Sequence, residues 1–278
     1  MKKTVSILLF VLAVVFLYSK SVIAVSIVPQ ETFVKKVGGD NVEVITMIPP
    51  GYSPANYAPT PRELMQFSDA KIYFTMGVPT EKVNILPEVE SFNEDMKIVS
   101  LQDEVEKIYP ARYFSPETRD PHIWMSPKRV MVMIDTIQKE LSALDPQNEE
   151  YYKSNAEKYK NELYRLDEQL KEITENMSNR TFFIFHPALG YFADDYNLNM
   201  YALEKGGKDA TPKTLQEMID IAKKENIKVI FYQAEIDSKQ TTAFAEEIGG
   251  KSLKLDPLSA DYIANLENIA ETFSQELN

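Results

Sequence analysis

The chain has 278 residues, a formal net charge of −12, 44% hydrophobic residues and no cysteine. The excess of acidic side chains makes nucleic acid a poor partner. The lack of cysteine excludes disulfides, thiolate metal ligands and a lipid anchor attached through cysteine. Any metal site must therefore use imidazole, carboxylate or other oxygen and nitrogen groups. The length suffices for one large hydrophobic core or two ordinary ones.

Residues 1–24 predict a cleavable signal peptide. Two lysines follow Met1, an apolar run extends from Val5 to Tyr18, and the small-residue sequence Val22-Ile23-Ala24 comes next. The apolar run is shorter than the roughly 20 residues needed to span a bilayer, so a retained anchor is only the alternative. We expect cleavage after Ala24 and a mature protein that is periplasmic or otherwise extracytoplasmic, without a lipid anchor.

Residues 25–144 predict an α/β lobe. Short β-branched runs alternate with amphipathic segments, which is typical of α/β layers. Two helices are expected to begin at Thr60-Pro61 and Ser126-Pro127, since a hydroxyl residue can cap the first amides while proline occupies the first helical position. Thr60 with Glu63 adds a capping box. The strand candidates are Val44–Ile48, Ala70–Thr75 and Lys97–Val99.

Residues 145–178 predict one long helix that links two halves of the molecule. Asp145 is a candidate N-cap and Pro146 fits the first helical position. About 30 residues at 1.5 Å each give a rod of roughly 45 Å, long enough to span a whole molecule. A coiled-coil dimer stem is the alternative. The apolar stripe, with gaps of four and three residues, is Tyr159, Leu163, Leu166, Leu170, Ile173 and Met177.

Residues 179–278 predict a second α/β lobe, with a helix beginning at Thr211-Pro212. We therefore expect two α/β lobes joined by one long rigid helix, in a protein that is a monomer. The strand candidates of this half are Phe182–Phe185, Ile227–Tyr232 and Ser252–Leu255.

The only two histidines, His122 and His186, are candidate metal ligands. His122 lies in a short loop between Pro121 and the helix start at Ser126, and rigid loops commonly carry binding groups. His186 ends a strand candidate, at the edge where α/β sheets bind ligands. Asp256 repeats that placement after the last strand candidate. Two imidazoles and a carboxylate from three loops would suit a divalent transition ion.

Four short motifs occur in an order that resembles the zinc- and manganese-binding receptors of bacterial ABC importers, the cluster A-I family. This resemblance covers essentially the whole mature chain. It implies two α/β lobes with a divalent metal ion, as ligand, in the cleft between them. It also implies delivery of the ion to a membrane permease driven by an ATPase. The motifs are Pro50–Pro61, Asp120–Trp124, His186 with Gly190-Tyr191-Phe192, and Asp256-Pro257-Leu258.

The first motif departs from the family at the position of its first histidine ligand, which falls on Ala55. Alanine cannot coordinate an ion through its side chain. The family acids that flank this position fall on Ser53 and Ala58. Asn56 and Tyr57 are the nearest polar groups, so the shell would be completed by one of them, by water, or by a small chelator bound together with the ion.

Gln233 stands where relatives tend to carry glutamate, and Glu235 is close to it. We regard both as possible additional groups of the site. Histidine at the third ligand position, His186, rather than the glutamate of many manganese receptors, favours zinc over manganese.

Three classes of function remain open for this sequence. A binding protein is favoured, because no nucleophile elbow or phosphate loop is present. A metal-dependent hydrolase is the second class, since an open metal position could activate water with Glu204 or Glu235 as the general base. An adhesin on the same scaffold, acting in cell adhesion without metal, is the third. Another small solute could also replace the ion.

Overall fold

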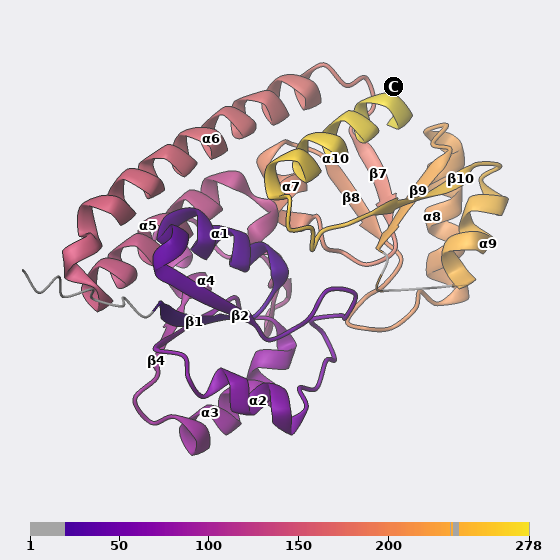
Figure 1. Ribbon diagram of the computed structural model, residues 1–278. Helices are drawn as coiled ribbons and strands as arrows, with labels where there is room; N and C mark the ends of the chain where they lie inside the picture. The colour runs from indigo at the N-terminus through magenta and orange to yellow at the C-terminus, as the bar shows by residue number, and fades with distance from the viewer. Residues whose placement is uncertain (1–19, 234, 236–238, 278) are drawn as a thin grey trace, which may run out of the picture.

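A computed structural model describes residues 20–233, 235 and 239–277. Figure 1 shows two α/β lobes side by side, with one long helix running along both of them. The expected fold class, two lobes joined by a long helix, is confirmed.

The N-terminal lobe is built on a parallel sheet with the strand order β2-β1-β3-β4. The three strand candidates predicted here are confirmed to within two residues at either end. A fourth strand, β1, was not predicted. The strands are β1 (Ser21–Val25), β2 (Val42–Thr46), β3 (Ile72–Thr75) and β4 (Lys97–Ser100).

The position of β1 corrects the predicted cleavage after Ala24. Ile23, Ala24 and Val25 are fully buried, and β1 pairs with both β2 and β3 in the sheet. Cleavage after Ala24 would remove most of a central strand. A buried parallel strand is a short apolar run, which is why Val22-Ile23-Ala24 resembles the end of a leader. Residues 1–19, with the rest of the predicted signal peptide, lie outside the described residues.

The helices of this lobe begin as the caps predict. Thr60 and Glu63 form the expected capping box at the start of α2, and the hydroxyl of Ser126 accepts a hydrogen bond from the amide of Arg129 at the start of α5. The helices are α1 (Val28–Gly38), α2 (Pro61–Phe67), α3 (Leu86–Phe92), α4 (Leu101–Glu106) and α5 (Pro127–Leu144). A small antiparallel hairpin, β5 (Tyr113–Ser115) with β6 (Thr118–Arg119), precedes α5.

The C-terminal lobe repeats this arrangement with the parallel order β10-β9-β7-β8. Its three predicted strands are confirmed, and β8 at the edge was not predicted. Thr211 caps α8 as expected. The elements are β7 (Thr181–Ile184), α7 (Gly190–Asp195), β8 (Asn199–Ala202), α8 (Pro212–Lys224), β9 (Val229–Gln233), α9 (Lys239–Glu247), β10 (Lys251–Leu255) and α10 (Tyr262–Leu277).

The linking helix, α6 (Glu149–Glu175), packs against α1 and α5 of the first lobe and α10 of the second (Figure 1). A short 3-10 turn, Pro146–Asn148, precedes it, with Asp145 at the N-cap. The carboxylate of Asp145 accepts hydrogen bonds from Asn148 and Tyr152. The predicted stripe faces the core: its first four residues are buried in α6, Ile173 is partly buried, and Met177, two residues after α6, is buried.

One continuous hydrophobic cluster extends from β1 and α1 through α5 and α6 to β7, β9 and α10. The two lobes are thus joined by shared apolar packing as well as by the chain, which limits their relative motion. A smaller cluster, including Phe67, Tyr73 and Val89, covers the other face of the first sheet. Among the described residues, none of the helices is both long and apolar enough to cross a membrane.

A buried carboxylate, Glu81, holds the loop at the carboxyl edge of the first sheet. It accepts hydrogen bonds from the hydroxyl of Ser26 and, at 2.7 Å each, from the amides of Met76 and Gly77. Burial raises the pKa of Glu81 to about 7, although these hydrogen bonds act in the opposite direction. The loop that follows β3, which includes Val78, is therefore held by hydrogen bonds to a carboxyl group that titrates near neutral pH.

We predict that the side-chain carboxyl carbon of Glu81 titrates with a midpoint near pH 7 in a carbon-13 NMR experiment. Because its pKa is raised on folding, Glu81 contributes stability that is fully present below about pH 4.5. That contribution is lost as the pH rises through 7, at a cost of about 3 kcal/mol. A midpoint near 4.5 for Glu81 would contradict this prediction.

Candidate metal centre

His122 is held in the first lobe by the residues on either side of it. It directly precedes a 3-10 turn, Ile123–Met125, that leads into α5. The carboxylate of Asp120 accepts hydrogen bonds from both the backbone amide of His122, at 3.0 Å, and its ring Nδ1, at 2.7 Å. The imidazole is therefore fixed in orientation and almost fully buried, with 8% of its surface exposed.

His186 is held in the second lobe at the carboxyl ends of β7 and β8. It lies two residues after β7, and Glu204 lies two residues after the neighbouring strand β8. The Nδ1 of His186 is 2.8 Å from Oε2 of Glu204. The other oxygen, Oε1, accepts a hydrogen bond from the amide of Gly207 at 3.0 Å. The parallel sheet thus brings together two residues that are 18 positions apart in the sequence.

The two imidazoles face each other across the interlobe boundary, with their Nε2 atoms 3.2 Å apart. Since a carboxylate only accepts hydrogen bonds, each Nδ1 carries the proton and each Nε2 presents its lone pair. Two facing lone pairs repel each other unless a cation lies between them. A tetrahedral ion bound 2.0–2.1 Å from both nitrogens would separate them by about 3.3 Å. The observed spacing therefore suits one shared metal ion.

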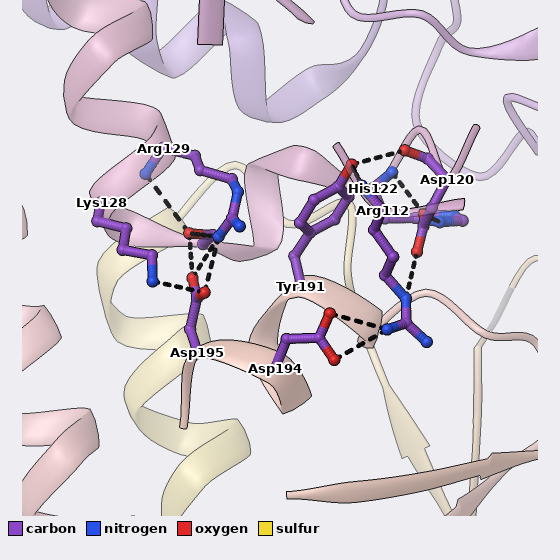
Figure 2. Close-up of polar contacts among 9 residues, drawn as sticks. Arg112, Asp120, His122, Lys128, Arg129, Tyr191, Asp194 and Asp195 are labelled. Atoms are coloured by element: carbon purple, nitrogen blue, oxygen red, sulfur yellow. Dashed lines mark hydrogen bonds and ion pairs between the residues drawn. The ribbon is translucent and has the colours of Figure 1, made fainter. Parts of the chain in front are cut away.

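Asp120 is itself held by residues of both lobes. Its Oδ2 pairs with Nε of Arg112 at 3.2 Å, and Arg112 forms a two-oxygen ion pair with Asp194 of α7 (Figure 2). The hydroxyl of Tyr191, also on α7, donates to the backbone carbonyl of Asp120 and accepts from the amide of Arg112. These contacts anchor the carboxylate that orients His122.

Gly190 permits this close approach of α7 to the first lobe. A Cβ atom at position 190 would lie 2.2 Å from Nε of Arg112 and 2.7 Å from Oδ2 of Asp120. Any side chain would therefore displace the Arg112–Asp120 pair. The motif residues Gly190 and Tyr191 thus help to position Asp120, which in turn orients His122.

A second set of interlobe contacts involves Asp195, at the end of α7. Its carboxylate accepts hydrogen bonds from Arg129 at 2.7 Å and from the hydroxyl of Ser126, and it pairs with Lys128 at 2.7 Å (Figure 2). Asp195 and Arg129 are both buried, so their charges are poorly screened. These contacts fix the start of α5, four residues beyond His122, to the second lobe.

A cavity of about 390 Å³ opens beside the two histidines, between the lobes. Its walls are mainly apolar, with Trp124 and Phe114 near His122. The indole Nε1 of Trp124 donates to the carbonyl of Pro257 at 2.8 Å, which ties this wall to the segment after β10. The polar residues in the walls are Ser53, Thr118, Arg119, Glu204 and Gln233.

Burial lowers the pKa of His122, and the hydrogen bond with Asp120 only partly offsets this effect. His122 is therefore neutral at pH 7, as a metal ligand must be. For Glu204, burial alone would raise the pKa, but the hydrogen bond with His186 and the hydrogen bond from the amide of Gly207 lower it overall. Glu204 is therefore ionised and stabilises positive charge on this side of the site.

The structure leaves two of the predicted groups, Asp256 and Glu235, outside this cavity. Both line a smaller neighbouring pocket of about 70 Å³. The exposed carboxylate of Asp256 accepts a hydrogen bond from the amide of Leu258 at 3.2 Å. Within the described part of the chain, no three histidine, aspartate or glutamate side chains form a group that could hold an ion. The structure brings the two histidines together without the predicted carboxylate.

The remaining predicted groups divide between the cavity and the loop beside it. Ala55 lines the cavity, as the resemblance implies for the first ligand position. Asn56 is exposed, and neither it nor Tyr57 is part of the cavity wall. The hydroxyl of Tyr57 donates to Glu63 in the capping box of α2, at 2.8 Å. Gln233 does reach the cavity and is 6% exposed.

Sequence reasoning missed the roles of Asp120 and Glu204 in holding the histidines. Asp120 is two residues before His122, a spacing at which a carboxylate can reach both the amide and the ring of the histidine. This role could therefore have been predicted from the local sequence. Glu204 was considered only as a general base. Its place beside His186 follows from the pairing of β7 with β8, and β8 was not predicted.

We predict that Glu204→Ala weakens zinc binding about 10–100-fold, as expected for loss of a partner that orients a metal-bound histidine. The reason is that His186 would lose the acceptor that fixes its tautomer and ring direction. Competition against a zinc-sensitive fluorescent chelator measures the affinity. The matched control is Glu217→Ala on the exposed side of α8, which should leave it unchanged. An unchanged affinity in Glu204→Ala would contradict the assigned role.

Comparisons with known proteins give one consistent result. The family model described as "ZnuA: Zinc-uptake complex component A periplasmic" matches residues 23–276. The Bacillus subtilis protein named high-affinity zinc uptake system protein ZnuA is 27% identical over 242 residues, covering 83% of this chain and 76% of the relative. A crystal structure of ZnuA has a TM-score of 0.88 at 34% identity, covering 94% of this chain and 100% of that one. A ZnuA deletion mutant with zinc bound has a TM-score of 0.88 at 35% identity, with 94% and 99% covered.

Proposed function

Because this chain belongs to the ZnuA family of periplasmic zinc-uptake components, we propose that it captures one divalent metal ion between its two lobes. It then delivers the ion to the permease of an ABC importer, which is driven by an ATPase. The observation that carries this proposal is the 3.2 Å approach of the two imidazole Nε2 atoms, each ring held by a carboxylate at Nδ1.

We propose zinc rather than manganese as the ion. Imidazole nitrogen suits zinc, whereas manganese prefers carboxylate, carbonyl and water oxygens. The two side chains that meet in the cavity are both imidazoles. Elemental analysis of the purified protein, with calorimetry over a panel of zinc, manganese and other divalent ions, tests the proposal. About one ion per chain is expected, with zinc bound most tightly. No heat with any ion would refute it.

We propose Asp256 as a third protein ligand, on the strength of its motif. Its carboxylate is exposed and held by a single amide, and the next two residues, Pro257 and Leu258, line the histidine cavity. Coordination would require the side chain to turn from the neighbouring pocket toward the imidazoles. Calorimetry on Asp256→Asn tests this role. If Asp256 is a ligand, the affinity for zinc should fall. If it is not a ligand, the affinity should be unchanged.

A metal-dependent hydrolase is the second function considered, and the geometry favours it less. Glu204, one candidate general base, has both carboxylate oxygens engaged, one by His186 and one by the amide of Gly207. The other candidate, Glu235, lines the neighbouring pocket. The family is one of transport components, and we propose that the chain is no enzyme. Turnover of a peptide or ester panel would refute this.

We propose an exported monomer whose leader is removed before Ser21, because β1 begins there and is needed in the sheet. Mass spectrometry of the intact secreted protein tests the position, and size-exclusion chromatography with light scattering tests the oligomeric state. A mature N-terminus at Val22 or at any later residue would contradict the proposed start.

A further inference from the structure

The cavity beside His122 and His186 is much larger than an ion requires. It measures about 390 Å³, whereas a water molecule occupies about 30 Å³. Pockets for small organic ligands range from roughly 300 to 1,000 Å³. Ala55 lines the cavity, and its methyl side chain occupies little of this space and offers no ligand atom.

Two side chains in the wall, Gln233 and Arg119, each have a buried nitrogen without a hydrogen-bond partner in the described part of the chain. Gln233 is 94% buried and lines the cavity at the end of β9, and its Nε2 has no hydrogen-bond acceptor. A buried amide donor without an acceptor carries a free-energy cost, because it has lost its water. An acceptor atom on a bound molecule would remove that cost. In Arg119, the atom without a partner is Nε, while Nη1 pairs with Asp103 and Glu106 and Nη2 donates to the carbonyl of Gln102.

The charge around the histidines points to the same kind of molecule. The side chains that meet are two imidazoles, and the carboxylates of Asp120 and Glu204 contact their Nδ1 atoms, on the side of each ring away from the facing Nε2 atoms. An ion held by two imidazoles keeps open coordination positions. Oxygen atoms of an anionic chelator could fill these positions while another of its oxygens accepts from Gln233.

We propose that the cavity takes the divalent ion as a complex with a small carboxylate-bearing chelator, which coordinates the ion and accepts a hydrogen bond from Gln233. This inference rests on the proposed function and specifies its substrate. The chelator occupies the space between Ala55 and the histidines, with the apolar walls of Phe114 and Trp124 around it.

The test is native mass spectrometry with equilibrium dialysis of the metal-free mature chain. The probes are zinc alone, citrate alone, iminodiacetate alone, zinc with either carboxylate, and zinc with ethylenediamine, which chelates without a carboxylate. We expect zinc and a carboxylate chelator to be retained together in a 1:1:1 complex. Zinc should bind at least tenfold more tightly in that complex than alone, and neither chelator should be retained without zinc.

Gln233→Leu is the diagnostic variant, because leucine keeps the bulk of the side chain and removes the donor. It should weaken the ternary complex about tenfold, the loss expected for a hydrogen bond to a charged acceptor, and should weaken this complex more than it weakens binding of zinc alone. Gln216→Leu, at an exposed position of α8, is the matched control and should change neither.

The outcomes separate this inference from the function on which it rests. The inference is overturned if zinc binds alone and citrate and iminodiacetate only remove it from the protein. It is also overturned if ethylenediamine is retained as well as citrate. In both cases the receptor assignment stands. A ternary complex unaffected by Gln233→Leu overturns the role of Gln233. If zinc is not bound under any condition, the proposed function and the inference both fail. If Gln233→Leu does not fold, the comparison of probes on the unmodified chain still decides whether zinc and a carboxylate chelator bind together.

Discussion

Replacing either His122 or His186 by alanine is expected to abolish binding of zinc at micromolar concentrations. Each imidazole supplies one of the two Nε2 atoms, 3.2 Å apart, between which the ion would lie. The affinity for zinc should fall by more than the 10–100-fold expected when a partner that orients a ligand is removed, because here a ligand itself is removed. Calorimetric titration with zinc measures the effect, with elemental analysis of the purified variants as a second reading.

The matched control for both variants is Thr118→Ala, which alters the wall of the same cavity without removing an imidazole. It should bind zinc as the unmodified chain does. Thermal unfolding of the metal-free variants must show that the fold persists. His186→Ala is the safer of the two, since the carboxylate partner of His122 is fully buried whereas Glu204 is partly exposed. Zinc binding of ordinary strength in both variants would place the ion elsewhere.

Replacing Ala55 by histidine is expected to raise the affinity for zinc without added chelator by about tenfold or more. Ala55 is exposed and lines the cavity that also contains the two histidines. A third imidazole in this position would fill one of the coordination positions that the chain leaves open. The gain should be measured at pH 7.5 or above, where an unperturbed imidazole is mostly neutral.

The matched control is Ala58→His, three residues further along the same exposed loop but outside the cavity wall. It adds the same side chain and should leave zinc affinity unchanged. Ala55→His should also lessen the advantage of zinc with citrate over zinc alone, because the new imidazole competes with the chelator for the ion. An affinity equal to that of the unmodified chain would mean that the loop does not reach the ion.

Local features of the fold could be predicted from the sequence because their causes act within a few residues. A hydroxyl group and a proline at Thr60, Ser126 and Thr211 each begin a helix where expected, since a cap is completed within three residues. The stripe along α6, from Tyr159 to Ile173, follows the helical period over about four turns and packs against the core. The same reasoning failed at β1, because a short buried strand and the end of a leader have the same apolar pattern.

The sequence by itself determined that this chain has two α/β halves, a helix joining them, and two histidines as its candidate metal ligands. The tertiary structure decided how these ligands are arranged. It placed Glu204 beside His186 through the pairing of β8 with β7, and it placed α7 against Asp120 because Gly190 leaves room for Arg112. It also placed Asp256 in the neighbouring pocket, and opened a cavity beside Ala55 and Gln233. Such contacts join segments far apart in the sequence, and their geometry depends on sheet register and on packing between lobes, which no local pattern encodes.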